Sequence, residues 1–176
     1  MTQLRSTAPT FTRPNDTTQY GSGDLVANNT AAASVVALNF KFERHGLPHK
    51  QLSIRTGIIS ASGTGVTSKA LRIHLFSGAG PTFTSAGDNS AISTVVATGA
   101  ALWIGALDIT SMTAVADGSF GVGAPLAGSE IIWDCTDAVG VGNHLNLYGI
   151  LEARGAYTPT AQETFTVTIA GIPVAD

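Results

Sequence analysis

The sequence is short of charge, of cysteine and of long apolar runs. Charged residues make up 12% of the 176 residues, and Cys135 is the single cysteine. One cysteine excludes an intramolecular disulfide and a cysteine-based metal cluster. No stretch approaches the roughly 18 consecutive apolar residues of a membrane-spanning helix, and the first residues lack the apolar core of a secretory signal. We therefore expect synthesis in a cytoplasm and no membrane partner.

A basic surface is also missing. The formal net charge is -3, and the nine Lys and Arg residues are scattered along the chain. Nucleic-acid affinity comes largely from clustered Lys and Arg that neutralise phosphates, so we expect no nucleic-acid partner. The low charge instead favours a surface that contacts other protein, because soluble monomers of this size usually carry more charge.

Alternating apolar and polar residues are the main structural signal that is present. Near the C-terminus, two segments show it most clearly, with these apolar sets: Leu145, Leu147, Leu151 and Ala153; Phe165, Val167 and Ile169. Period-2 alternation places one set on a buried sheet face and the other in water. The two segments therefore predict an antiparallel hairpin, or two strands of one sandwich.

Similar short runs recur along the chain and set the predicted fold. They occupy residues 35–42, 52–58, 71–76, 102–104 and 131–133, with Gly, Ser and Pro between them. We predict an all-β domain over residues 32–176, an antiparallel β-sandwich of jelly-roll-like form with about eight strands. The glycine-rich stretch 118–128 lacks the ending of a phosphate-binding loop and is interpreted as turns.

Residues 1–31 show no sustained periodicity and are rich in Thr, Pro, Asn, Gly and Ser. We interpret them as an extended N-terminal arm that grips a neighbouring subunit. Loose packing on the same domain and plain disorder are the alternatives.

Motifs for catalysis or metal binding are weak throughout. His45 and His49 have the spacing of a metal-binding helix, but Gly46 and Pro48 break that helix. His74 falls on the polar side of its strand and is expected to be exposed or at an interface. The loop that holds Asp88 has too few carboxylates to predict a calcium site.

Carboxylate pairs give no better case for an enzyme. Glu130 with Asp134, or Glu152 with Glu163, could be drawn as hydrolase pairs, but no spacing selects them. Cys135 lies in an apolar run and is interpreted as a small buried hydrophobe. We therefore expect no enzymatic activity, no catalytic or metal residues and no cofactor.

Aromatic side chains leave one further alternative open. Four of them could form a sugar-stacking platform, although core packing is the commoner fate of such residues in strands. They are Trp103, Trp133, Tyr148 and Tyr157.

Two stretches resemble small structural proteins of tailed bacteriophages. The first, residues 13–28, is similar to their R-P-x-D-T-x-x-Y-x-x-G-D-x-V-A-x opening, and the second, residues 147–159 with 164–168, is similar to their C-terminal strand pair. The run 70–76, followed by Pro81 and Asp88-Asn89, fits the same pattern. The resemblance touches both ends and the middle of the chain and contains no catalytic signature.

This resemblance implies a non-enzymatic capsid decoration, or cement, protein on the outer surface of a virion. Its expected partners are the major capsid protein and itself, as a homotrimer. The contact residues expected from the first stretch are Arg13, Pro14, Asp16, Tyr20, Asp24, Leu25 and Val26. The alternative is a carbohydrate-binding β-sandwich of a phage head or tail fibre, with a glycan as its partner.

Overall fold

The computed structural model describes residues 3–43, 51–93, 95, 99–126, 129–135 and 144–174. Within these residues every strand pairing is antiparallel. The strands are β1 (Leu4–Arg5), β2 (Thr10–Thr12), β3 (Leu25–Val26), β4 (Leu38–Glu43), β5 (Gln51–Ala61), β6 (Leu71–Phe76), β7 (Trp103–Ile109), β8 (Thr113–Val115), β9 (Gly118–Pro125), β10 (Ile131–Asp134), β11 (His144–Ala153) and β12 (Thr164–Pro173). One turn of 3-10 helix, η1 (Ala32–Ser34), precedes β4.

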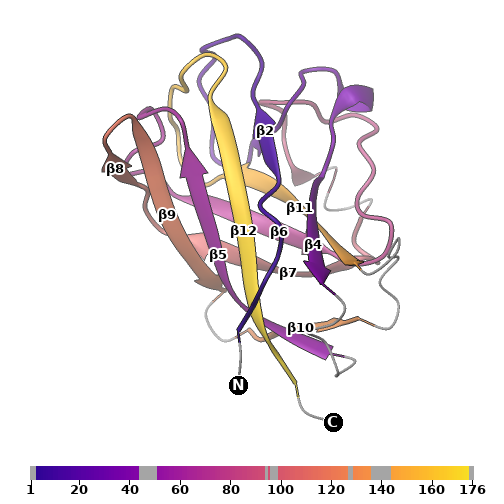
Figure 1. Ribbon diagram of the computed structural model, residues 1–176. Coiled ribbons are helices and arrows are strands. Elements are labelled where there is room, and N and C mark those ends of the chain that lie inside the picture. Colours follow the sequence, from indigo (N-terminus) through magenta and orange to yellow (C-terminus); the bar gives the residue numbers. More distant parts are fainter. Residues whose placement is uncertain are drawn as a thin grey trace.

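The strands form two layers that share β9. In the first layer β1 and β2 pair with β12, followed by β5 and β9, with β8 and β10 at the borders. In the second layer β7 is followed by β6 and β11, and β3 and β4 pair with β11. Figure 1 shows β12, β5 and β9 in front, with β6, β7 and β11 crossing behind them. The prediction of an all-β antiparallel sandwich of jelly-roll-like form is confirmed.

The main core fills the space between the two layers. Its large side chains include Trp133, Phe40, Phe42 and Phe165, all almost completely buried. The rings of Phe42 and Trp133 lie 5.5 Å apart and join β4 to β10. The apolar sets predicted from alternation near the C-terminus all lie in this core, so the alternation located it correctly.

A second apolar cluster lies on the outer face of β11, where the alternation predicted water. Ile150 is buried there with Leu25, Phe76 and Ile92, and Tyr148 packs against the group. The long segment between β6 and β7 contributes Ala86, Ile92 and Val95 and thereby covers this face. β11 is therefore buried on both sides, which alternation alone does not reveal.

β11 and β12 belong to different layers. β11 pairs with β4 and β6, whereas β12 pairs with β5. Of the two predicted arrangements, the hairpin is wrong and the two strands of one sandwich are correct.

The interpretation of residues 118–128 as turns is wrong for residues 118–125, because these form β9, the strand shared by both layers. Its glycines are needed for close packing. A Cβ added at Gly121 would come within 2.6 Å of both Ile109 Cγ2 and Met112 Sδ, and one at Gly123 within 2.9 Å of Ile109 Cγ1. Glycine in a strand interior often marks such a close approach.

The N-terminal segment packs on its own domain. Leu4 pairs with Gly171, Phe11 with Phe165 and Val26 with Leu151. The predicted extended arm therefore differs from the structure, because these short strands add to the edges of both layers. They are two or three residues long, too short to show an alternating pattern. β8 and β9 were not predicted either. With these five additions to the seven predicted runs, the described part of the chain has 12 strands.

Gly121→Ala should destabilise the fold by about 1–3 kcal/mol, because the added methyl group must displace Ile109 and Met112 from a packed core. Urea denaturation measures the effect. Ala124→Val is the matched control, since Ala124 is exposed on the same strand. Equal stability of Gly121→Ala and the wild type would contradict the close packing of β9.

Candidate functional site

Most residues of the predicted contact motif face the chain itself. Arg13, Tyr20, Leu25 and Val26 are buried, while Pro14, Asp16 and Asp24 are partly exposed. Their contact with a capsid stays a prediction. What the structure provides is an intramolecular role for most of the motif, described next.

Arg13, Tyr20 and Asp88 form a buried polar network. The Arg13 Nε–H donates to the Tyr20 hydroxyl, which donates to Asp88 Oδ1 at 2.6 Å. Arg13 Nη2 lies 2.9 Å from Asp88 Oδ2, and the Ala27 N–H donates to Asp88 Oδ1 at 2.7 Å. A buried charge needs a partner and hydrogen bonds of this kind, because desolvation is costly.

Burial governs the ionisation of this network. It raises the pKa of the Tyr20 hydroxyl, and the neighbouring Asp88 carboxylate raises it further. Burial also raises the pKa of Asp88, against the hydrogen bonds from Tyr20 and Ala27 and the charge of Arg13. Tyr20 therefore stays a neutral hydrogen-bond donor, and Arg13 is the permanent charge that holds Asp88.

The remaining motif residues shape the turns around the network. Asp16 Oδ1 accepts from the Thr18 N–H at 3.0 Å and lies 3.5 Å from Arg13 Nη2. Asp24 Oδ2 accepts from the Gly21 N–H at 2.5 Å. Gly23, with a φ of 94°, supplies the left-handed backbone between them. The motif thus forms a turn that is held on the domain by the buried network of Arg13, Tyr20 and Asp88, which we call the N-terminal anchor.

Both oxygens of Asp88 accept hydrogen bonds from protein groups, Oδ1 from Tyr20 and Ala27 and Oδ2 from Arg13. Among the described residues, no three His, Cys, Asp or Glu side chains are grouped to hold a metal. Asn89 follows in a left-handed conformation, and its side-chain amide donates to the Gln19 carbonyl at 3.2 Å. The Asp88-Asn89 pair therefore ties the segment between β6 and β7 to the N-terminal turn.

A second polar cluster lies on β6, β7 and β11. His74, expected to be exposed or at an interface, is buried within the chain, with Nε2 2.9 Å from Glu152 Oε2. Arg72 makes two hydrogen bonds to Asp108, at 2.5 and 3.1 Å, and Arg154 reaches Glu152 at 2.9 Å. Burial opposes ionisation of Glu152, but the bonds from His74 and Arg154 prevail, and the pKa of Glu152 lies below its ordinary value.

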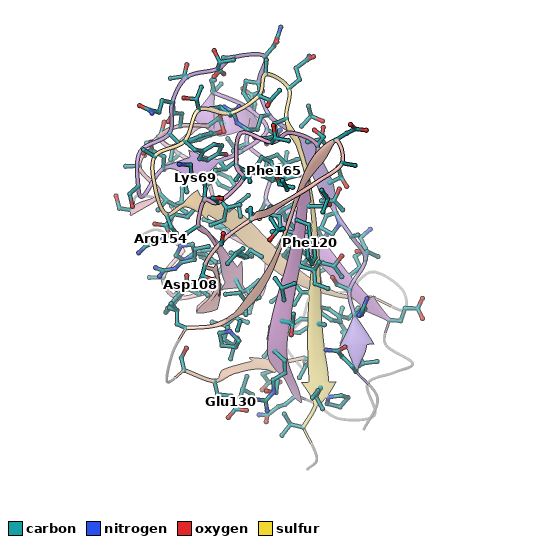
Figure 2. All side chains as sticks on the ribbon, turned by 90° about the vertical axis from the view of Figure 1, so that its left-hand side faces the viewer. Lys69, Asp108, Phe120, Glu130, Arg154 and Phe165 are labelled. Atoms are coloured by element: carbon teal, nitrogen blue, oxygen red, sulfur yellow. The ribbon has the colours of Figure 1, made fainter. Side chains whose placement is uncertain are left out.

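A shallow hollow of about 240 Å³ borders this second cluster, with Arg72, Asp108 and Arg154 in its lining. Figure 2 shows Arg154 and Asp108 along one edge of the molecule, with Lys69 above them and Glu130 at the opposite end. The charges of this hollow are paired within the chain. The arrangement provides cross-strand ion pairing.

The outer face of the first layer is a surface of hydroxyl and apolar side chains, which we call the threonine face. Arg5, opposite Ala170 of β12, and Asp108, opposite Ala124 of β9, place charges at its borders. Residues directly opposite each other in the strand pairings share a side of the sheet. The residues on this side are Thr10, Thr12, Thr56, Ile58, Ser60, Thr113, Val115, Phe120, Val122, Ala124, Thr164, Thr166 and Thr168. All are exposed or partly exposed.

The threonine face combines hydroxyl groups with exposed apolar side chains. Phe120 is 40% exposed and Val122 52% exposed on β9, and Figure 2 shows Phe120 toward the viewer. Thr10 and Thr12 of β2 form side-chain hydrogen bonds with Thr166 and Thr164 of β12, at 2.9 and 3.0 Å. Sequence reasoning missed this face because it did not place residues 118–125 in a strand.

Other residues considered in the sequence are placed as follows. Glu130 is exposed and pairs with Arg55 at 3.2 Å, and Asp134 is also exposed. Cys135 is buried, as expected, and burial raises the pKa of its thiol to about 12. His45 and His49 lie outside the described residues.

The two tryptophans have different environments. Trp133 is fully buried in the core, whereas Trp103 is 40% exposed on β7, with its ring 6.4 Å from that of His74. No helix in the described ranges has the length and apolarity needed to cross a membrane.

Tyr20→Phe should destabilise the protein by about 1–3 kcal/mol, because Arg13 and Asp88 would each lose a buried partner. Thermal unfolding measures the change. Tyr148→Phe, which removes a hydroxyl from a partly exposed tyrosine, is the matched control and should unfold close to the wild type. A Tyr20→Phe protein as stable as the control would show that the network contributes nothing.

Comparison with known proteins gives no family. No family model and no curated protein matches the chain. Among solved structures, it is similar to a chain of the native virion of Kashmir bee virus at acidic pH, with 9% identity and a TM-score of 0.29. The match covers 98% of this chain and 71% of that chain. A likeness this distant carries no argument about function.

Proposed function

We propose that this chain is a non-enzymatic bacteriophage decoration protein that binds the shell of a capsid and stabilises it. The observation that carries the proposal is the threonine face. A continuous surface whose centre has exposed Phe120 and Val122, with charges only at its borders, is typical of protein contact sites, whose centres are depleted of charged residues. The resemblance of residues 13–28 and 147–159 to phage virion proteins supports the kind of partner.

In this proposal the threonine face contacts the major capsid protein. Hydroxyl groups and a few apolar side chains give weak contacts per copy, and many copies on a symmetric shell act together. The buried N-terminal anchor has a different task, which is to hold residues 4–26 on the edges of both layers. The protein acts as a homotrimer on the outer capsid surface, and this assembly is part of the proposal.

Replacing both Phe120 and Val122 by Lys tests the docking face. We expect the double variant to fold, because both side chains are exposed. It should co-sediment with undecorated capsids of the encoding phage at least tenfold more weakly than the wild type, since two charges would be desolvated in the contact.

Gln51→Lys is the control, because it adds one positive charge at an exposed position of β5 away from the threonine face. It should bind as the wild type does. A wild-type protein that stays in the supernatant, or a double variant that still pellets fully, would refute docking through this face. Mass measurement in solution tests the homotrimer separately.

Carbohydrate binding is the second candidate, and Trp103 is the observation that favours it. Its exposed indole lies beside His74 and could stack on a sugar ring. Trp133 has no part in such a platform, because it is buried in the core. A glycan array that compares the wild type with Trp103→Ala tests this function. A glycan that binds the wild type and does not bind Trp103→Ala would support it.

A further inference from the structure

Beneath the N-terminal turn lies a cluster of buried polar atoms that lack hydrogen-bond partners. They are Arg13 Nη1, the Tyr157 hydroxyl and both oxygens of the Glu163 carboxyl group. Glu163 is only 1% exposed and precedes β12 directly. An ionised carboxylate in such a place is costly, because burial removes its hydration and no protein group among the described residues donates a hydrogen bond to it.

Backbone contacts fix residues 13–20 against the loop that holds Glu163. The Arg13 N–H donates to the Glu163 carbonyl at 2.9 Å, and the Tyr20 N–H donates to the Tyr157 carbonyl at 3.0 Å. The rings of Tyr20 and Tyr157 stack with centroids 4.9 Å apart. Any change in the charge state of Glu163 therefore acts directly on this segment.

The charges around Glu163 do not balance when its carboxyl group is ionised. Arg13, from the segment after β2, is the nearby positive group, and Asp88 and Asp16 already share it at 2.9 and 3.5 Å. Tyr20 and Tyr157 are neutral hydroxyls.

On the side of the loop after β5, Gly63 lies against the Glu163 carboxyl group. A Cβ built on Gly63 would lie 2.5 Å from Glu163 Oε1 and 2.7 Å from the Thr160 hydroxyl. An ionised Glu163 would thus be an excess buried negative charge.

We propose that Glu163 is a proton-operated latch: with its proton bound, residues 13–20 stay closed on the loop 157–163, and loss of the proton favours their opening. The latch goes beyond the proposed function and does not depend on capsid binding.

The direction of the pH dependence follows from burial. Burial raises the pKa of Glu163 to about 7, against the opposing charge of Arg13. In the open segment, the carboxyl group returns to its ordinary, lower pKa. The closed state is therefore most stable at acidic pH, and its stability is lost as the pH rises through about 7.

Hydrogen exchange of the Arg13 and Tyr20 amides, corrected for intrinsic exchange, measures the opening constant between about pH 5 and 8. In the wild type it should rise by close to tenfold per pH unit up to about pH 7 and then level off. Glu163→Gln should remove most of this slope; Asp88, whose pKa burial also raises, contributes what remains. Glu130→Gln, a control at an exposed glutamate paired with Arg55, should keep the wild-type profile.

A carbon NMR titration of the Glu163 carboxyl group in the wild type gives a second test that needs no variant. A midpoint near 7 is expected. A midpoint at the ordinary value of a glutamate, a wild-type opening constant without a pH slope, or an undiminished slope in Glu163→Gln would each overturn the latch. Because no capsid is used, such a failure would leave the proposed docking face untouched.

Discussion

The buried ion pair between Arg13 and Asp88 is the interaction on which the arrangement of the outer segments depends. It joins the N-terminal segment to the segment between β6 and β7, and Tyr20 bridges the two charges. Removing one partner of such a pair typically costs about 3–5 kcal/mol, because the other charge remains buried. Tyr20 also stacks on Tyr157, so the loop before β12 is held by the same anchor. Three segments distant in sequence thus share one point of attachment.

Alternation of apolar and polar residues predicted those strands whose burial pattern is written within the strand itself. β6, β11 and β12 are long enough to alternate, and their predicted apolar sets lie in the core. In β5, Leu52 and Ile54 lie there too, but Ile58 lies on the threonine face, because the register shifts by one residue between Ile54 and Thr56. β9 was missed because its glycines are required by close packing against Ile109, which no pattern within the strand reveals. His74 was misplaced because the partner that makes its burial tolerable, Glu152, comes from another strand.

In the candidate site, too, the local motif could be recognised from the sequence, whereas its tertiary contacts could not. The opening motif was recognised, but its meaning depends on Asp88, a residue 75 positions from Arg13 that no spacing rule connects to it. Once that contact is known, the motif explains why residues 3–31 do not form a free arm in this structure. The threonine face depends on strand order across β2, β12, β5, β9 and β8, and strand order is a tertiary property. Low charge in the composition indicated a contact surface and gave no location for it.

These observations separate two ways of holding a shell, one through an extended N-terminal arm and one through the threonine face. Cryo-electron microscopy of capsids decorated with the full chain distinguishes them directly. We expect density in which the threonine face, with Phe120 and Val122, is buried against the shell, and residues 13–20 remain on their own sandwich. Density in which residues 1–31 extend into a neighbouring subunit while Phe120 and Val122 stay in solvent would contradict this assignment.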